Sequence, residues 1–204
     1  FSALPPERAA ERRQEQRFAL QALSALCRER GCDAVLLSGD LFDSARIYRD
    51  TLDALRRFFA DCGAEVFIAA GNHDYLSPGS PYLTEAWPEN VHIFTSGRPV
   101  CVDEPELGCA VWGAAFTAAE EADGSALTAV RCPDDGRTHL MVLHADLSAP
   151  DSRYRPITPA QIGETGLSYL ALGHTHAFSG VLHAGRTTFA YPGCPEGRGF
   201  DELG

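Results

Sequence analysis

The sequence predicts an α/β sandwich, and two features of its pattern carry that prediction. Apolar strands alternate with helices over residues 1–70, whereas the later strands follow one another without long helices between them. Early alternation followed by hairpins favours a mixed sandwich of sheets and helices over a barrel. With 204 residues, 45% of them hydrophobic and 22% charged, the chain can bury a sizeable core.

The first four predicted elements alternate in type. Residues 5–30 predict a long amphipathic helix that ends at Gly31. Its apolar stripe consists of Phe18, Ala22, Leu23, Leu26 and Cys27. We expect a short apolar strand at residues 33–38, a second helix at 48–62 and a buried strand at 64–70.

The remainder of the chain is richer in strands. Residues 76–90 contain three prolines and predict a surface loop, and residues 158–165 predict a short helix. Apolar runs predict strands at 91–94, 100–102, 109–116, 139–145 and 167–172, and a terminal hairpin at 181–183 and 187–191.

Net charge, cysteine spacing and the length of apolar runs each bear on what kind of protein this is. A net charge of −11 argues against a surface built for non-specific DNA binding, because phosphates favour a basic face. All 17 basic residues are arginines; this suits phosphate recognition, although a GC-rich genome explains it more simply. The seven cysteines include no Cys-x-x-Cys pair, so we expect buried thiols in a reducing cytoplasm. No apolar run of 18 residues occurs, so no membrane partner is expected.

Four polar clusters each follow directly on an apolar strand. They are Gly39-Asp40-Leu41-Phe42-Asp43, Gly71-Asn72-His73-Asp74, His144, and Gly173-His174-Thr175-His176. Ligands of open α/β sheets bind beyond the carboxyl ends of strands, so these clusters should meet at one rim. Carboxylate, amide oxygen and neutral imidazole, without thiolate, suit Mn, Fe, Zn or Co rather than a structural zinc site.

Each cluster alone also has an ordinary structural explanation. A Gly-Asp pair is usually a turn, a histidine on an apolar strand is often a satisfied core residue, and Asp43 can cap the next helix. Glycines 39, 71 and 173 fit places where the chain turns sharply or passes close to a ligand. The ordered set of four, each at a strand end, favours the functional interpretation.

In this order the motifs resemble those of calcineurin-like metallophosphoesterases. Residues 191–202 are similar to the segment after the last metal motif in SbcD-type DNA repair exonucleases, and nearer still to their YhaO-like branch. The resemblance covers essentially the whole chain. It implies a metallophosphoesterase-like αββα sandwich of two mixed sheets flanked by helices.

The resemblance also implies two divalent metal ions, with Mn expected first and Fe, Zn or Co as alternatives. Asp40 would bridge the two ions. Asn72, His144 and His174 would complete the shell of one ion, and His176 would serve the other.

The implied catalytic pair is His73 and Asp74. His73 would stabilise the transition state or protonate the leaving group during in-line hydrolysis of a phosphodiester, and Asp74 would orient it. A metal-ligating or structural role is the alternative for His73. The nearby Arg153-Tyr154-Arg155 could bind backbone phosphate and stack on a base, although a solvated loop is the simpler explanation.

One family motif has no match here. Family members carry Asp-x-His on the first strand, and none precedes Asp40. We therefore expect residues 1–204 to be a nuclease core that lacks its first strand, its Asp-x-His segment and its C-terminal cap domain. The ion served by His176 would then be weakly held or absent, which leaves the activity of this fragment open.

The leading functional interpretation is a DNA repair exonuclease or endonuclease subunit that acts on DNA ends. By resemblance, its partner would be an SbcC-like ATPase and its working unit a cytoplasmic homodimer. A small-molecule phosphodiesterase or phosphatase is the alternative that the acidic charge favours. A catalytically dead interaction module would fit the missing motif, but the five other predicted ligands argue against it.

Overall fold

The computed structural model describes residues 5–43 and 47–195, and it confirms an α/β fold with two sheets flanked by helices. Nearly every predicted element is present, with ends that differ by one or two residues. In chain order the elements are α1 (Pro6–Arg30), β1 (Ala34–Leu37), α2 (Arg49–Asp61), β2 (Glu65–Ala69), α3 (Pro81–Thr84), β3 (Val91–Phe94), β4 (Val100–Glu104), a 3-10 turn (Pro105–Leu107), β5 (Cys109–Ala114), β6 (Thr138–His144), α4 (Pro159–Glu164), β7 (Tyr169–Gly173), β8 (Leu182–Ala184) and β9 (Thr187–Ala190).

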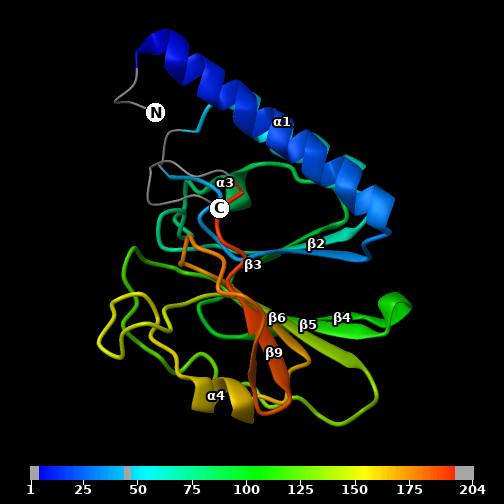
Figure 1. The fold of residues 1–204 in the computed structure, drawn as a ribbon, viewed down its shortest axis with the longest axis vertical. Coiled ribbons are helices and arrows are strands. Elements are labelled where there is room, and N and C mark those ends of the chain that lie inside the picture. Colours follow the sequence, from blue (N-terminus) through cyan, green and yellow to red (C-terminus); the bar gives the residue numbers. More distant parts are fainter. Residues whose placement is uncertain (1–4, 44–46, 196–204) are drawn as a thin grey trace. The chain divides into compact units, whose positions relative to one another are not determined.

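The chain divides into two compact units. Unit 1 comprises residues 1–35, 46–66 and 87–91, and unit 2 comprises residues 36–45, 67–86 and 92–204. Unit 1 is dominated by α1, drawn in blue in Figure 1, and by α2, which packs against α1. All the side chains predicted to form the site belong to unit 2.

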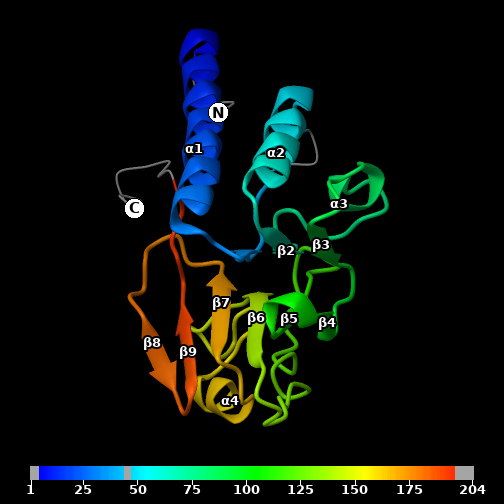
Figure 2. The ribbon, with the colours of Figure 1, turned by 90° about the vertical axis from the view of Figure 1, so that its right-hand side faces the viewer.

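The strands form a sheet of three, in the order β1-β2-β3, and a sheet of six, in the order β4-β5-β6-β7-β9-β8 (Figure 2). In the larger sheet the four central strands are parallel, and β4 and β8 are antiparallel edge strands, so this sheet is mixed as expected. His144 is in register with Gly173, which brings the carboxyl ends of β6 and β7 level with each other.

One face of the larger sheet is covered by α4 and the segment before β6. Leu127, Met141, Ile162 and Leu170 are fully buried in this core. The short helix α4 begins with a capping box, in which the side chains of Thr158 and Gln161 each bond the other's backbone amide. A local signal and a buried face thus both fix α4 against the sheet.

The helix α1 ends as predicted but does not bury the predicted stripe. Gly31 adopts the left-handed conformation (φ 59°) that ends the helix, as glycine does without steric cost. Phe18 and Leu26, however, are 56% and 44% exposed, because the inward face runs through Ala9 and Ser24 instead. Among described residues, no helix is both long and apolar enough to cross a membrane.

Two smaller predictions also need correction. The stretch 76–90 is not only a surface loop, because it contains α3 and the almost fully buried Tyr82. The cysteines are not uniformly buried: Cys62 and Cys109 are, whereas Cys101 is exposed.

Candidate metal centre

The loops after β1, β2 and β7 meet so closely that glycine is required at the contacts. A Cβ atom on Gly71 would lie 2.2 Å from Oδ1 of Asp40, and one on Gly173 would lie 1.9 Å from the carbonyl oxygen of Ser38. Neither distance is compatible with a side chain. The close approach predicted at these glycines is therefore real, and it is an approach of one loop to another.

Asp40 stands at the centre of these loops with its backbone in the left-handed region (φ 56°). That conformation is uncommon outside glycine, although aspartate and asparagine adopt it more readily than most residues. The Oδ1 atom of Asp40 accepts a hydrogen bond from the backbone amide of His73 at 3.0 Å. The first two motifs are thus joined through the carboxylate that was predicted to bridge two ions.

The carboxylate of Asp74 holds the Asp40 loop in place. It accepts hydrogen bonds from the backbone amides of Asp40 (3.1 Å), Leu41 (2.8 Å) and Gly71 (2.7 Å), and from the hydroxyl of Tyr82 (2.5 Å). Burial raises the pKa of Asp74, and the bonds from Tyr82 and Gly71 oppose that rise.

These contacts differ from the role predicted for Asp74. Its hydrogen bonds to described residues run to the neighbouring loops and to Tyr82, and not to the exposed imidazole of His73. Asp74 is therefore placed to position Asp40. The catalytic role of His73 stays a prediction.

His144 is fixed in one tautomer. Its Nδ1 atom lies 2.8 Å from the carbonyl oxygen of Ser38, which can only accept, so Nδ1 carries the proton. Burial lowers the pKa of His144 to about 4, against the opposing effect of the Asp40 carboxylate, and the ring is neutral at pH 7. Its Nε2 atom consequently presents a lone pair.

That lone pair faces two further acceptors. Nε2 of His144 lies 2.9 Å from Oδ1 of Asn72 and 3.4 Å from Oδ2 of Asp40. If the Asn72 amide were rotated so that its nitrogen faced His144, Nε2 would gain a donor, but the negative charge of the Asp40 carboxylate would still lack a partner. A cation would interact favourably with all three atoms at once. Mixed nitrogen and oxygen donors of this kind fit a divalent transition metal.

His174 is the fourth predicted ligand that the structure brings to this group. Its ring packs edge-on against that of His144, with centroids 5.4 Å apart, and its backbone has a positive φ of 110°. Its Nε2 atom lies 3.6 Å from Oδ2 of Asp146, and the ring of Tyr154 packs beside it at 5.1 Å. Asp146 was not identified from the sequence, because nothing in its local pattern marks it.

Asp146 is itself held rigidly. The amide and hydroxyl of Ser148 donate to its Oδ1 at 2.7 and 2.6 Å. Burial opposes its ionisation, but hydrogen bonds from Ser148 and Ser152 dominate together and lower the pKa of Asp146. An ionised carboxylate therefore lies near Nε2 of His174, and its charge favours a proton on Nε2, which would leave Nδ1 with a lone pair.

The Arg153-Tyr154-Arg155 segment is solvated only in part: Arg153 is exposed, whereas Arg155 is buried and not available to bind phosphate. Arg155 is 1% exposed and donates to the carbonyl oxygens of Ala114 (3.0 Å) and Ala115 (2.9 Å), and it also pairs with Glu121. Its guanidinium lies over the ring of Phe116, 4.5 Å from the centroid. Arg155 thus anchors the loop that places Tyr154 and Asp146 beside His174.

The remaining predicted residues lie at the rim. His73 is exposed, with its backbone bonded to Asp40. His176 is exposed two residues beyond His174, and its carbonyl oxygen accepts from the amide of Cys194 (2.9 Å). Its assignment to a second ion stays a prediction. Residues 196–202 of the segment similar to SbcD-type nucleases lie outside the described part of the chain.

Comparisons with known proteins agree with this arrangement. The chain is 34% identical over 180 residues to YhaO of Bacillus subtilis, named as an uncharacterized metallophosphoesterase; the match covers 84% of this chain and 43% of that protein. It is 32% identical over 177 residues to the DNA double-strand break repair protein Mre11 of Aeropyrum pernix, covering 79% of this chain and 43% of that protein. The chain thus spans about 43% of the length of either relative.

The family profile described as calcineurin-like phosphoesterase matches residues 13–178, a range that includes all four clusters of the site. Members of this family hydrolyse phosphoester bonds and bind divalent metals. The matched range and the convergence of Asp40, Asn72 and His144 lead to the same conclusion: the chain belongs to the calcineurin-like phosphoesterase family.

Proposed function

We propose that the protein is a two-metal phosphodiester hydrolase that acts on DNA ends. The observation that carries the proposal is the convergence of three acceptor atoms, one each from His144, Asn72 and Asp40, in a setting that a cation would balance. The similarity to a protein named for DNA double-strand break repair supports DNA as the substrate. We propose Mn as the metal, with Fe, Zn or Co as alternatives, because the carboxylate and amide oxygens suit Mn while the imidazoles suit Fe or Zn.

The chain's own residues have distinct tasks in this proposal. Asp40, Asn72, His144 and His174 would hold one ion, and Asp40 with His176 would contribute to the second. Divalent cations bound there supply Lewis-acid polarisation of the phosphoryl group and activation of water.

Neighbouring residues fix the protonation state and the position of the proposed metal ligands. The Ser38 carbonyl keeps the proton of His144 on Nδ1, so that its Nε2 needs no deprotonation at pH 7. Asp74 fixes the backbone of Asp40. The exposed imidazole of His73 would reach the substrate and exchange a proton with it.

A second candidate is a phosphodiesterase or phosphatase for small esters, and charge favours it. Unit 2, which carries the site, has 18 acidic residues against 7 arginines. Such a balance repels a polyanion more than it repels a small monoester or diester.

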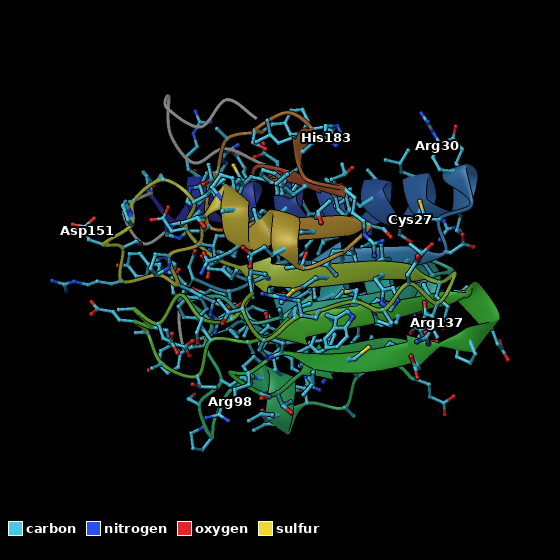
Figure 3. All side chains as sticks on the ribbon, turned by 90° about the horizontal axis from the view of Figure 1, so that it is seen from below. Cys27, Arg30, Arg98, Arg137, Asp151 and His183 are labelled. Carbon is cyan, nitrogen blue, oxygen red and sulfur yellow. The ribbon has the colours of Figure 1, made fainter. Side chains whose placement is uncertain are left out.

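The full-length protein with Mn²⁺ tests both candidates on linear DNA and on bis(p-nitrophenyl) phosphate. Cleavage of both is expected, whereas cleavage of the small ester alone would overturn the nuclease proposal. Asp40→Asn should abolish both activities and reduce Mn²⁺ binding in calorimetry at least tenfold. Asp103→Asn is the matched control, because Asp103 is an exposed carboxylate of unit 2 that pairs with Arg137, which Figure 3 labels.

We further propose that the full-length protein is a cytoplasmic homodimer that associates with an SbcC-like ATPase. Support comes from the resemblance of the motifs to SbcD-type nucleases. Light scattering of the full-length protein, alone and mixed with the candidate ATPase, checks the homodimer and the complex. A monomer that shows no complex would overturn them.

A further inference from the structure

A groove of about 300 Å³ runs between α1 and α2 within unit 1. The residues that line it recur every three or four positions on both helices, so one continuous face of each helix contributes. The members that matter below are Arg17, Phe18 and Arg28 from α1, and Arg57, Phe58 and Asp61 from α2.

Two of the three arginines in this groove have no carboxylate partner among the residues that the structure describes. Arg28 donates to the hydroxyl of Ser24 (2.9 Å) and to the carbonyl oxygen of Asp61, and Arg57 donates to the carbonyl oxygen of Asp53 (3.1 Å). Neither forms an ion pair with any residue that the structure describes. Their charges are therefore available to an anionic ligand.

Arg17 adds an unsatisfied donor to the same groove. Its Nη2 atom bonds to Asp50 at 3.2 Å, but its Nε–H is buried and has no acceptor in the described part of the chain. A buried N–H without a partner costs roughly 1–3 kcal/mol, so a ligand that brought an acceptor to Arg17 would relieve this cost. Three arginines against Asp61 alone make the groove basic.

An aromatic ring lies beside these charges. Phe18 is 56% exposed, while Phe58 is buried. Arginine forks match phosphate oxygens, and an exposed aromatic ring can stack on a nucleobase. The combination fits a phosphate that is covalently linked to an aromatic base.

The distribution of charge between the two units also favours a nucleotide ligand on unit 1. Unit 1 carries 10 of the 17 arginines against 10 acidic residues, so it is neutral overall, and the net charge of −11 resides in unit 2. A nucleic acid therefore finds its least repulsive surface on unit 1.

We propose that this groove binds a nucleotide segment of single-stranded DNA, with phosphate on Arg28 and Arg57, an additional bond to Arg17, and a base on Phe18. The proposal goes beyond the hydrolytic function, because it concerns unit 1 and requires no metal. The groove would give an acidic protein a place to hold a DNA strand.

The test is fluorescence anisotropy of a labelled oligothymidylate with the full-length protein in excess EDTA. Removing both unpaired charges in Arg28→Gln/Arg57→Gln should weaken binding at least tenfold. It should also reduce the slope of log K against log salt by about 1.4, at roughly 0.7 per lost phosphate contact. The control Arg8→Gln/Arg30→Gln removes the same charge from α1 outside the groove and should change binding less than twofold; Figure 3 labels Arg30.

A second pair of variants tests stacking. Phe18→Ser should weaken binding threefold or more, whereas Leu26→Ser, an exposed apolar residue of the same helix that does not line the groove, should not. Absence of binding by the unmodified protein, or equal loss in the groove and control variants, would overturn the proposal.

Folding and catalysis are checked separately. Arg57 is exposed, and its hydrogen bond to the described part of the chain lies within its own helix. Arg57→Gln alone should therefore keep the thermal unfolding temperature of the unmodified protein while still weakening binding. Hydrolysis of bis(p-nitrophenyl) phosphate should be unchanged in the groove variants. A failure of the groove proposal is thereby distinguishable from a failure of the proposed hydrolase.

Discussion

The hydroxyl of Tyr82 donates to Oδ2 of Asp74 at 2.5 Å, and through Asp74 it supports the loop that carries Asp40. Tyr82 is 4% exposed, and burial together with the Asp74 charge raises its pKa well above the usual value. The phenol therefore stays protonated and acts only as a donor. A residue outside the four motifs thus sets the geometry of the predicted bridging ligand.

Replacing Tyr82 by phenylalanine should destabilise the protein by about 1.5–3 kcal/mol, because a hydrogen bond to a buried charged acceptor is lost. Urea unfolding followed by circular dichroism measures the change. Tyr75→Phe is the control; Tyr75 is 37% exposed, and its variant should remain within about 0.5 kcal/mol of the unmodified protein. If the two variants were equally stable, the Tyr82 hydroxyl would not contribute to holding the site in place.

The sequence was sufficient to predict which residues meet, but not what holds them. Asp40, Asn72, His144 and His174 could be predicted because each lies at or just beyond the carboxyl end of a strand. The sequence did not show that Asp40 and Asn72 follow strands of the three-stranded sheet, whereas His144 and His174 come from the six-stranded sheet. Asp146 and other supporting residues could not, because their contacts arise from loop paths that local patterns do not encode.

The error in α1 has a related cause. Periodicity predicted a helix over residues 5–30, but several faces of this arginine-rich helix have similar apolar content. Only its packing in unit 1 selected the face through Ala9 and Ser24 over the one through Phe18.

The stability of the metal-free protein should fall with decreasing pH because of His144. Its pKa is about 4 in the folded state, below the 6.5 of an unperturbed histidine, so the unfolded chain binds the proton more tightly. The stabilisation is fully present above pH 6.5 and is lost as the pH falls from 6.5 towards 4, by about 3 kcal/mol in all.

Urea unfolding in EDTA at several pH values, compared with His144→Gln, isolates this contribution from the acidic residues that titrate in the same range. The variant should show a shallower dependence between pH 4 and pH 6.5. Parallel curves for the two proteins would mean that His144 is not held neutral.

Asp146→Asn should weaken Mn²⁺ binding by about 10- to 100-fold, because the carboxylate no longer fixes the tautomer of His174. Titration calorimetry of the full-length protein at pH 7.5 measures the affinity. Asp151→Asn is the control from the same loop; Asp151 is exposed, and Figure 3 labels it. If the affinity of Asp146→Asn were unchanged, Asp146 would stabilise the loop through Ser148 but would have no effect on metal binding by His174.

Arg155→Met should destabilise the protein by about 3–5 kcal/mol. The buried ion pair with Glu121 is broken, and a carboxylate that is largely buried is left without its partner. Arg153 provides a control two residues away, since it is 71% exposed and pairs with Glu120 at the surface. Arg153→Met should cost no more than about 1 kcal/mol, as surface ion pairs contribute little.

The double variant Glu121→Gln/Arg155→Met separates the charge from the packing. If the uncompensated carboxylate causes most of the loss, the double variant should recover more than half of it in urea unfolding. If the loss persists, the guanidinium bonds to Ala114 and Ala115 are the larger contribution. A single variant Arg155→Met as stable as Arg153→Met would contradict the anchoring role, and the placement of Tyr154 beside His174 would then need another cause.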